Sequence, residues 1–292
     1  MESYRKCPNL NVAVPSDAGE LWFRRAKWTA PKQRLFCFPY AGGSARLFRS
    51  WHEWLAPEIE AIAVELPGRG FHVRSPLIDD IDEMIAQILT VIDPLIDIPF
   101  ALFGHSMGAL IAFELSVALR RTERNLPAHL FVSAMCAPHA AHLRKMAHHL
   151  PDSEFLNMLR SLNGTSADAL DDRGLLELFL PILRADFRLA ETYMYTPQPP
   201  LPHPITVFGG LADPTTPADS LPAWGKHTAG ECSIRLLEGD HFFIHHHDHV
   251  MAASISKSLL TSPNRVGTFP PPSVSRHNPQ TLLAGPDEVS SP

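Results

Sequence analysis

The stretch that decides the fold is PFALFGHSMGALIAFELSVAL, residues 99–119. It opens on an apolar run typical of a buried strand, passes through Gly-His-Ser-Met-Gly at 104–108, and continues as an apolar run of helical length. A serine between two glycines at such a junction is the pattern of a nucleophile elbow, a tight strand-to-helix turn that presents Ser106. Because the turn is strained and crowded, we expect Gly104 and Gly108 to be required for space.

Short apolar runs alternate with helical patterns on both sides of this stretch. Most of the runs are apolar on both faces, as expected for strands that helices cover on each side. We expect strands at 34–38, 61–66, 100–103, 130–135, 205–209 and 233–237, and an earlier pair of strands that includes LWFRR at 21–25. Helical patterns cover 81–92 and 108–121. The alternation predicts an α/β fold with a mainly parallel, doubly wound sheet.

One segment interrupts the alternation. Between 139 and 196 only helical patterns occur, and an insertion of this length is interpreted as a helical lid. The lid belongs to a single predicted hydrolase domain at 1–262. Residues 263–292 are rich in proline and have little apolar periodicity, so we expect a disordered tail without a role in the chemistry.

Composition and charge exclude several classes of function. The 292-residue chain is 45% hydrophobic and 19% charged, with a formal net charge of -6, so a nucleic-acid partner is not expected. The opening residues contain no apolar core of signal-peptide length, so no signal peptide is expected. The most apolar window carries His105 and Glu114 and contains a strand-to-helix break, so no membrane span is expected. We therefore expect a cytoplasmic protein, and a monomer. The cysteines are too widely spaced to indicate a disulfide framework or a zinc site, and no cofactor is expected.

Ser106 needs a base, and the base needs an orienting acid, because an alkoxide does not form unaided at neutral pH. In this fold the chain order is serine, acid, histidine. His241 is the best-placed base, since it follows a strand and a glycine-containing loop near the end of the domain. The competing histidines of the predicted next helix are His245, His246, His247 and His249. No carboxylate or cysteine set completes a metal site with them, and we interpret this run as a solvated helix start.

Asp213 is the predicted acid. It follows the strand at 205–209, and Pro214 stiffens its loop. Asp219 lies further along, and Asp240 adjoins the base but is expected to point away from its ring. Some proteins of this architecture carry the acid after the preceding strand, but here that position reads SAMCAPH and contains no carboxylate.

The glycine-rich loop FPYAGGSARLF at 38–48 is the candidate source of an oxyanion donor. In this fold one donor follows the nucleophile and a second comes from the loop after an early strand. Gly42 and Gly43 let the backbone approach a ligand closely. The candidate donors are therefore the N–H groups of Ala41 and Met107.

These residues together resemble the type II thioesterases, free-standing α/β-hydrolases that serve polyketide synthases and nonribosomal peptide synthetases. The stretches that carry the resemblance are FPYAGGSA (38–45), ELPGRG (65–70), FGHSMGA (103–109), LPILRADFRLAETYMY (180–195), ITVFGGLADP (205–214) and GDHFFI (239–244). The resemblance covers roughly 28–260. It implies a triad of Ser106, Asp213 and His241, an oxyanion hole of Ala41 and Met107, and a lid over a channel for phosphopantetheine and acyl chain.

The resemblance implies carrier domains bearing phosphopantetheine thioesters as partners and hydrolysis through an acyl-enzyme as the reaction. A thiol has a pKa of about 8.5 and leaves as thiolate with little protonation, so thioester cleavage asks mainly for a nucleophile and an oxyanion hole. A carboxylesterase or lipase, an acyl transferase or cyclase, and a catalytically silent binding module are the alternatives on this fold.

Two further hypotheses concern the predicted lid. Its apolar residues either line an acyl path or pack the lid onto the domain. They are Leu156, Leu159, Leu176, Phe179, Leu183 and Phe187. Arg184 and Asp186, which belong to the family pattern, are a candidate ion pair on one helix face, although residues two apart do not face each other on a helix.

Overall fold

A seven-stranded sheet forms the centre of the molecule in this computed structural model, which describes residues 18–25, 30–143, 146–162 and 172–261. The strand order is β1-β3-β2-β4-β5-β6-β7. Only β1 is antiparallel to its neighbour β3, and every other pair is parallel. The predicted tail at 263–292 lies outside the described residues.

The elements follow one another as the alternating pattern predicts. The strands are β1 (Phe23–Arg25), β2 (Gln33–Phe38), β3 (Ile59–Val64), β4 (Phe100–His105), β5 (Leu130–Ser133), β6 (Ile205–Gly210) and β7 (Cys232–Leu237). The α-helices are α1 (Ala18–Trp22), α2 (Trp51–Trp54), α3 (Ile81–Val91), α4 (Met107–Arg121), α5 (Asp152–Ser161), α7 (Arg173–Glu191) and α8 (Ile244–Thr261). The short 3₁₀ helices are η1 (Ala45–Phe48), η2 (Gly70–His72), η3 (Asp93–Leu95), η4 (Pro138–Leu143) and η5 (Ala218–His227).

The predicted strands and both predicted helices are confirmed, with shifts of a few residues at their ends. Of the expected earlier pair, the described residues contain one strand, β1, and it is shorter than LWFRR, because Leu21 belongs to α1 and pairing with β3 begins at Phe23. Strands β2, β4, β5 and β6 are buried at every position, which explains their continuous apolar character.

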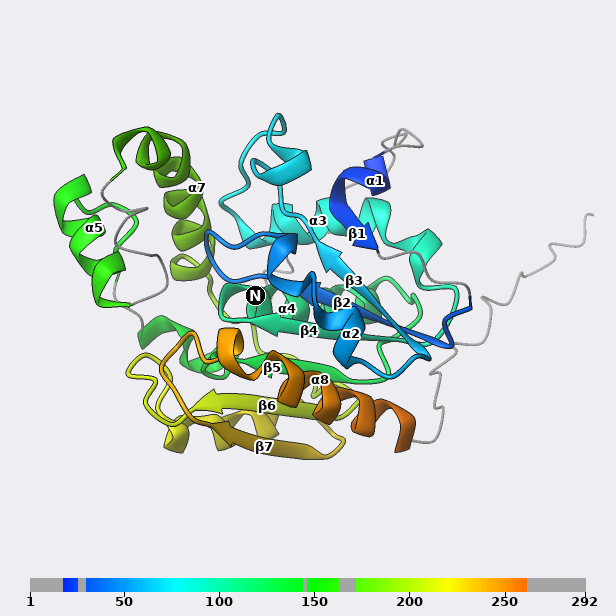
Figure 1. Ribbon diagram of the computed structural model, residues 1–292. Helices are drawn as coiled ribbons and strands as arrows, with labels where there is room; N and C mark the ends of the chain where they lie inside the picture. The colour runs from blue at the N-terminus through cyan, green and yellow to red at the C-terminus, as the bar shows by residue number, and fades with distance from the viewer. Residues whose placement is uncertain (1–17, 26–29, 144–145, 163–171, 262–292) are drawn as a thin grey trace, which may run out of the picture.

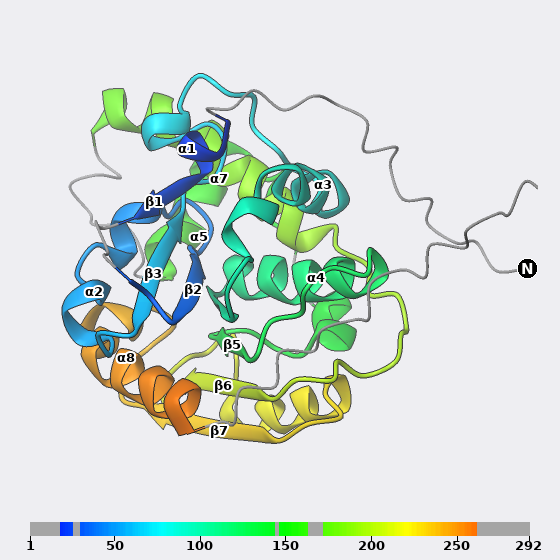
Figure 2. The ribbon, with the colours of Figure 1, turned by 90° about the vertical axis from the view of Figure 1, so that its right-hand side faces the viewer.

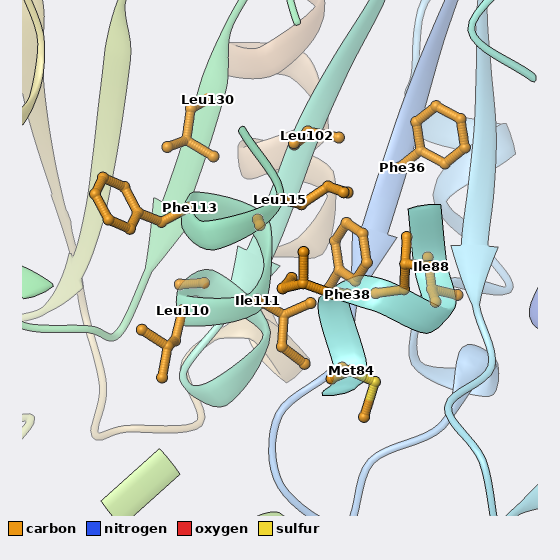
Figure 3. Close-up of a cluster of buried hydrophobic side chains, with 14 of the residues drawn as sticks. Phe36, Phe38, Met84, Ile88, Leu102, Leu110, Ile111, Phe113, Leu115 and Leu130 are labelled. Carbon is orange, nitrogen blue, oxygen red and sulfur yellow. The ribbon is translucent and has the colours of Figure 1, made fainter. Parts of the chain in front are cut away.

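Helices cover both faces of the sheet (Figure 2). Alternate residues along the strands pack into two cores, one on each face. Phe36 and Leu102 belong to the core on the side of α3 and α4, which also contains Leu110, Ile111 and Ile88 (Figure 3). Their neighbours along the strands instead belong to a second core that η1, α2 and α8 close. This three-layer arrangement buries β4 and α4, and it therefore holds the turn between them rigidly.

Helices α5 and α7 lie between β5 and β6 in the chain and beyond the carboxyl ends of the parallel strands (Figure 1). No strand occurs in the described part of 139–196, as predicted. Leu159 and Leu183 are buried in a small separate core, and Leu156, Leu176 and Phe187 pack against it. Phe179 is exposed. Packing within the insertion therefore accounts for five of the six apolar residues singled out there.

None of the helices that the structure describes is both long and apolar enough to span a lipid bilayer.

Buried neutral histidines are expected to make the fold acid-sensitive. Burial, followed by the charges of His129 and Arg120, lowers the pKa of His203 to about 3, and burial lowers that of His129 to about 4. The unfolded chain binds these protons below pH 6.5, so stability is full above that pH and falls as the pH drops toward the folded values. At pH 5 the loss is about 2 kcal/mol per histidine.

The measurement is urea unfolding at pH 7 and pH 5. Neither ring nitrogen of His203 has a hydrogen-bond partner in the described structure, so His203→Leu should reduce the difference between the two free energies of unfolding. His52→Leu, at an exposed site, is the control and should leave the difference unchanged. If the free energies of unfolding at pH 7 and pH 5 differ as much in His203→Leu as in the native protein, His203 does not contribute to the acid sensitivity.

Candidate active site

Ser106 occupies the turn between β4 and α4, as the nucleophile-elbow pattern predicts. Its backbone has φ 53° and ψ −120°, a conformation that side-chain-bearing residues rarely adopt. The amide of Ser106 donates to Ser133 O at 2.8 Å, which anchors the turn to β5. Rigid strand and helix packing on both sides maintains this strain, and the serine hydroxyl is held at the carboxyl edge of the sheet.

The two glycines that flank Ser106 are required for close backbone contact. A Cβ at Gly104 would lie 2.1 Å from Gly108 O, and a Cβ at Gly108 would lie 2.2 Å from Phe38 O. Both distances are far inside van der Waals contact. The expectation from the sequence is confirmed, and the second contact shows that the first turn of α4 lies directly against the end of β2.

His241 and Asp213 come together with Ser106 across 135 residues of sequence. His241 Nε2 lies 2.9 Å from Ser106 Oγ, and His241 Nδ1 lies 2.8 Å from Asp213 Oδ2. Because a carboxylate can only accept, Nδ1 carries the proton and Nε2 is left to accept from the serine hydroxyl. This tautomer is the one in which the imidazole can take the serine proton.

The Asp213 carboxylate is buried, and it stays ionised. Burial raises its pKa, but the hydrogen bond and charge of His241 and the hydrogen bonds from Thr215 outweigh burial and bring the pKa down to about 2. Oδ1 accepts from the backbone N–H groups of Thr215 and Thr216 at 2.8 and 3.2 Å. An ionised carboxylate beside Nδ1 stabilises the imidazolium that forms when His241 accepts a proton.

The alternative acids and bases do not reach this arrangement. The Asp240 carboxylate accepts from the N–H of Phe242, and Asp219 is exposed on η5. His245 and His247 belong to α8. The ring of His245 contacts Tyr40 OH, and the ring of His247 donates to Glu238 O. Within the described ranges no cluster of three or more histidine, cysteine or acidic side chains has the geometry of a metal site.

Thr215 contacts both the acid and the base, and it was not predicted from the sequence. Its hydroxyl donates to Asp213 Oδ1 at 2.7 Å and lies 2.8 Å from His241 Nδ1. The available signal was the pair of threonines directly after Asp213-Pro214, since short hydroxyl side chains often bond to the turn that carries them.

Thr215→Val is expected to lower kcat about tenfold, which corresponds to 1.4 kcal/mol of transition-state stabilisation. The methyl group replaces the hydroxyl at similar volume, and Asp213 retains its two backbone donors, so the fold is preserved. Steady-state hydrolysis of an acyl thioester measures the effect. Thr215→Ser restores the hydroxyl and should recover most of the rate, whereas a native rate in the valine variant would contradict the role.

His105 links the nucleophile turn to the loop that carries the base. Its Nε2 donates to the backbone carbonyl of His241 at 2.9 Å, which leaves Nδ1 to accept from Ser133 Oγ at the same distance. Burial, reinforced by the charge of His241, lowers the pKa of His105 to about 3. The side chain is therefore neutral at pH 7, and it fixes the height of the His241 backbone above the sheet.

Both candidate oxyanion donors lie beside Ser106 in the chain or in space. Met107 is the first residue of α4, where the N–H has no partner within the helix. Ala41 lies in the loop after β2. Phe38 and Pro39, which precede it in the chain, lie directly against Gly108 in the first turn of α4. Across the described residues, neither N–H makes a hydrogen bond to a protein acceptor. Two free N–H groups at this edge can stabilise a developing oxyanion.

Arg184 and Asp186 do not pair with each other, which corrects the hypothesis of a helix-face ion pair. Arg184 donates to the carbonyls of His148 and Leu150 and to Asp152. Asp186 faces the opposite way and binds Arg69. The separation follows from helical geometry, because residues two apart point in directions about 200° apart around the axis.

Comparison with known proteins identifies the family of this chain. The family model described as the thioesterase domain matches residues 33–258. The chain belongs to the thioesterase family. This thioesterase has the α/β-hydrolase fold, and it is an enzyme that hydrolyses thioesters.

Relatives of this thioesterase include peptide and polyketide biosynthesis proteins. The gramicidin S biosynthesis protein GrsT of Aneurinibacillus migulanus is 41% identical over 239 residues, which cover 82% of this chain and 93% of the relative. The type II thioesterase BorB from the borrelidin biosynthetic cluster has a TM-score of 0.75 at 36% identity, covering 82% of this chain and 98% of BorB. ClbQ from the colibactin NRPS/PKS pathway has a TM-score of 0.74 at 31% identity, covering 78% and 97%. The resemblance to type II thioesterases is confirmed.

Proposed function

We propose that this thioesterase removes acyl groups from the phosphopantetheine thiols of carrier domains in polyketide or nonribosomal peptide synthesis. The observation that carries the proposal is the hydrogen-bonded line from Asp213 through His241 to Ser106, in a chain that belongs to the thioesterase family. The class of partner is supported by three relatives: the gramicidin S biosynthesis protein GrsT, BorB from the borrelidin biosynthetic cluster and ClbQ from the colibactin NRPS/PKS pathway.

The proposed reaction has two stages. His241 Nε2 takes the proton of Ser106 while Oγ attacks the thioester carbonyl, and the N–H groups of Ala41 and Met107 stabilise the oxyanion. Collapse of the tetrahedral intermediate breaks the C–S bond, and the departing carrier thiolate takes the proton from His241, which leaves the imidazole neutral again. A water molecule that loses its proton to His241 then attacks the acyl-enzyme, which releases the acid and regenerates Ser106. Asp213 stabilises the imidazolium in both stages.

Helices α5 and α7 are the proposed lid over the acyl path. They lie beyond the carboxyl edge of the sheet, where Ser106 is presented (Figure 1). Leu183 of α7 lies close to the loop after β2: a Cβ placed on Gly42 would be only 2.5 Å from Leu183 Cδ2. The apolar side chains of this amphipathic helix suit contact with an acyl chain. The cytoplasmic location, the monomeric state and the boundaries of domain and tail stay predictions.

The test compares an acyl group presented on a phosphopantetheine-loaded carrier domain with the same acyl group as a matched oxygen ester. We expect faster turnover of the carrier thioester, and labelling of Ser106 by a fluorophosphonate. Preference for the oxygen ester would favour a carboxylesterase. Product analysis that finds a cyclised or transferred acyl group would favour a cyclase or transferase, and a protein without label at Ser106 would favour a silent binding module.

A further inference from the structure

The loop after β2 makes a tight turn at Tyr40–Gly43, called the oxyanion turn below. Gly43 N donates to Tyr40 O at 2.8 Å and closes the turn. Gly42, at the third position, has φ 78°, as a type II turn requires. Ala41 therefore occupies the second position, and the direction of its N–H depends on how the turn is held.

The carboxylate of Asp186, from α7, holds this turn from outside. Its Oδ2 accepts the N–H of Gly42 at 2.7 Å. The same oxygen accepts from Arg69 Nη1 at 2.6 Å, and Oδ1 accepts from Arg69 Nη2 at 2.7 Å. Arg69 Nη1 also donates to Gly43 O at 3.1 Å. The pair thus binds two successive residues of the oxyanion turn: Asp186 accepts from the N–H of Gly42, and Arg69 donates to the carbonyl of Gly43.

This arrangement is buried. Asp186 is 0% exposed and Arg69 is 6% exposed. A bidentate guanidinium–carboxylate pair has a fixed geometry, and the low local dielectric strengthens each of its hydrogen bonds. Leu183, one turn before Asp186 on α7, also packs on Gly42. Helix α7 and the oxyanion turn therefore form one rigid unit, although they come from segments more than a hundred residues apart.

We propose that Asp186, oriented by Arg69, is a positioning residue that sets the direction of the Ala41 N–H toward the developing oxyanion. The inference rests on the proposed function, since the donor matters only when a tetrahedral intermediate forms on Ser106. An oxyanion donor is effective only within a narrow distance range. A small displacement of the turn therefore weakens the stabilisation of the transition state without changing the affinity for the substrate. The predicted lid helix thus takes part in organising the site that it covers.

Two variants test the proposal. Asp186→Asn removes the charge and keeps the shape of the side chain. If the unpaired Arg69 prevents this variant from folding, the double variant Arg69→Met/Asp186→Leu removes both charges and leaves an apolar pair, a change that buried ion pairs often tolerate. Arg188→Met is the matched control, because Arg188 also joins α7 to the rest of the domain, through Asp79, but does not contact the oxyanion turn.

The readouts separate positioning from general damage. In Asp186→Asn or the double variant we expect kcat to fall about 10–100-fold and KM to stay within about twofold of the native value. Arg188→Met should keep a kcat near the native value. An acyl trifluoromethyl ketone, whose adduct with Ser106 carries the oxyanion, should lose affinity by the same factor as kcat. A non-cleavable thioether analogue should bind as before.

Three results would overturn the proposal: an unchanged kcat in a folded variant, an equal loss of affinity for ketone and thioether, or an equal loss of rate in Arg188→Met. A native protein without thioesterase activity toward carriers would instead refute the proposed function, so the two failures are distinguishable.

Discussion

Ser106→Ala is expected to lower kcat for thioester hydrolysis by about 10⁵-fold or more, since removal of the nucleophile leaves only oxyanion stabilisation and binding. The substitution deletes one oxygen atom and one hydrogen bond, the 2.9 Å contact to His241. The turn keeps its conformation, because the packing of β4 and α4 maintains the positive φ at this position. The thermal unfolding temperature should therefore stay close to that of the native protein.

Ser116→Ala is the matched control for this experiment. Ser116 is buried on α4, the helix that begins directly after Ser106. Its hydroxyl donates to Ala112 O at 3.1 Å. Its loss also deletes one oxygen and one hydrogen bond, but it should leave kcat near the native value. Ser106→Ala protein that is folded and retains more than about a hundredth of native activity would show that another group performs the attack.

His241→Ala is expected to be nearly as severe, with a loss of about 10⁴- to 10⁶-fold in kcat. The same imidazole serves both stages of the proposed mechanism, so neither acylation nor deacylation has a base in the variant. Asp213 keeps the N–H groups of Thr215 and Thr216 and the Thr215 hydroxyl as donors. The loss of His241 therefore leaves the carboxylate bonded, and the loop should remain folded.

His246→Ala is the control, because His246 belongs to the same histidine-rich run but is exposed on α8. It should retain native turnover. Hydrolysis of a carrier thioester and the rate of fluorophosphonate labelling at Ser106 are the two measurements, and both should collapse only in His241→Ala. A strong effect in His246→Ala with a mild one in His241→Ala would place the base elsewhere.

Local chemistry explains why so much of the site was predictable. The Gly-x-Ser-x-Gly turn is determined by steric contacts within a few residues, since any side chain at Gly104 or Gly108 collides with backbone. Parallel strands that are buried on both faces are mostly apolar, so β2, β4, β5 and β6 were recognisable from their apolar runs. Once the strands were placed, the positions of Asp213 and His241 followed from the rule that loops at carboxyl ends of parallel strands meet at one edge.

Polar contacts between distant segments were not predictable in the same way. The pattern at 184–186 suggested a local ion pair, but Arg184 bonds to the segment before α5 and Asp186 bonds to Arg69 and Gly42. No local rule specifies these partners, because a charged side chain buried by tertiary packing takes whichever opposite charge or free N–H the fold brings to it.

The sequence by itself determined the order of strands and helices, the strained serine turn and the identity of its predicted acid and base, because short-range sterics and the burial of apolar residues decide these features. Only the tertiary structure decided how Thr215, His105 and the Asp186–Arg69 pair are arranged around that turn. The physical reason is that hydrogen bonds and charges act over a few ångströms in space, whatever the distance along the chain.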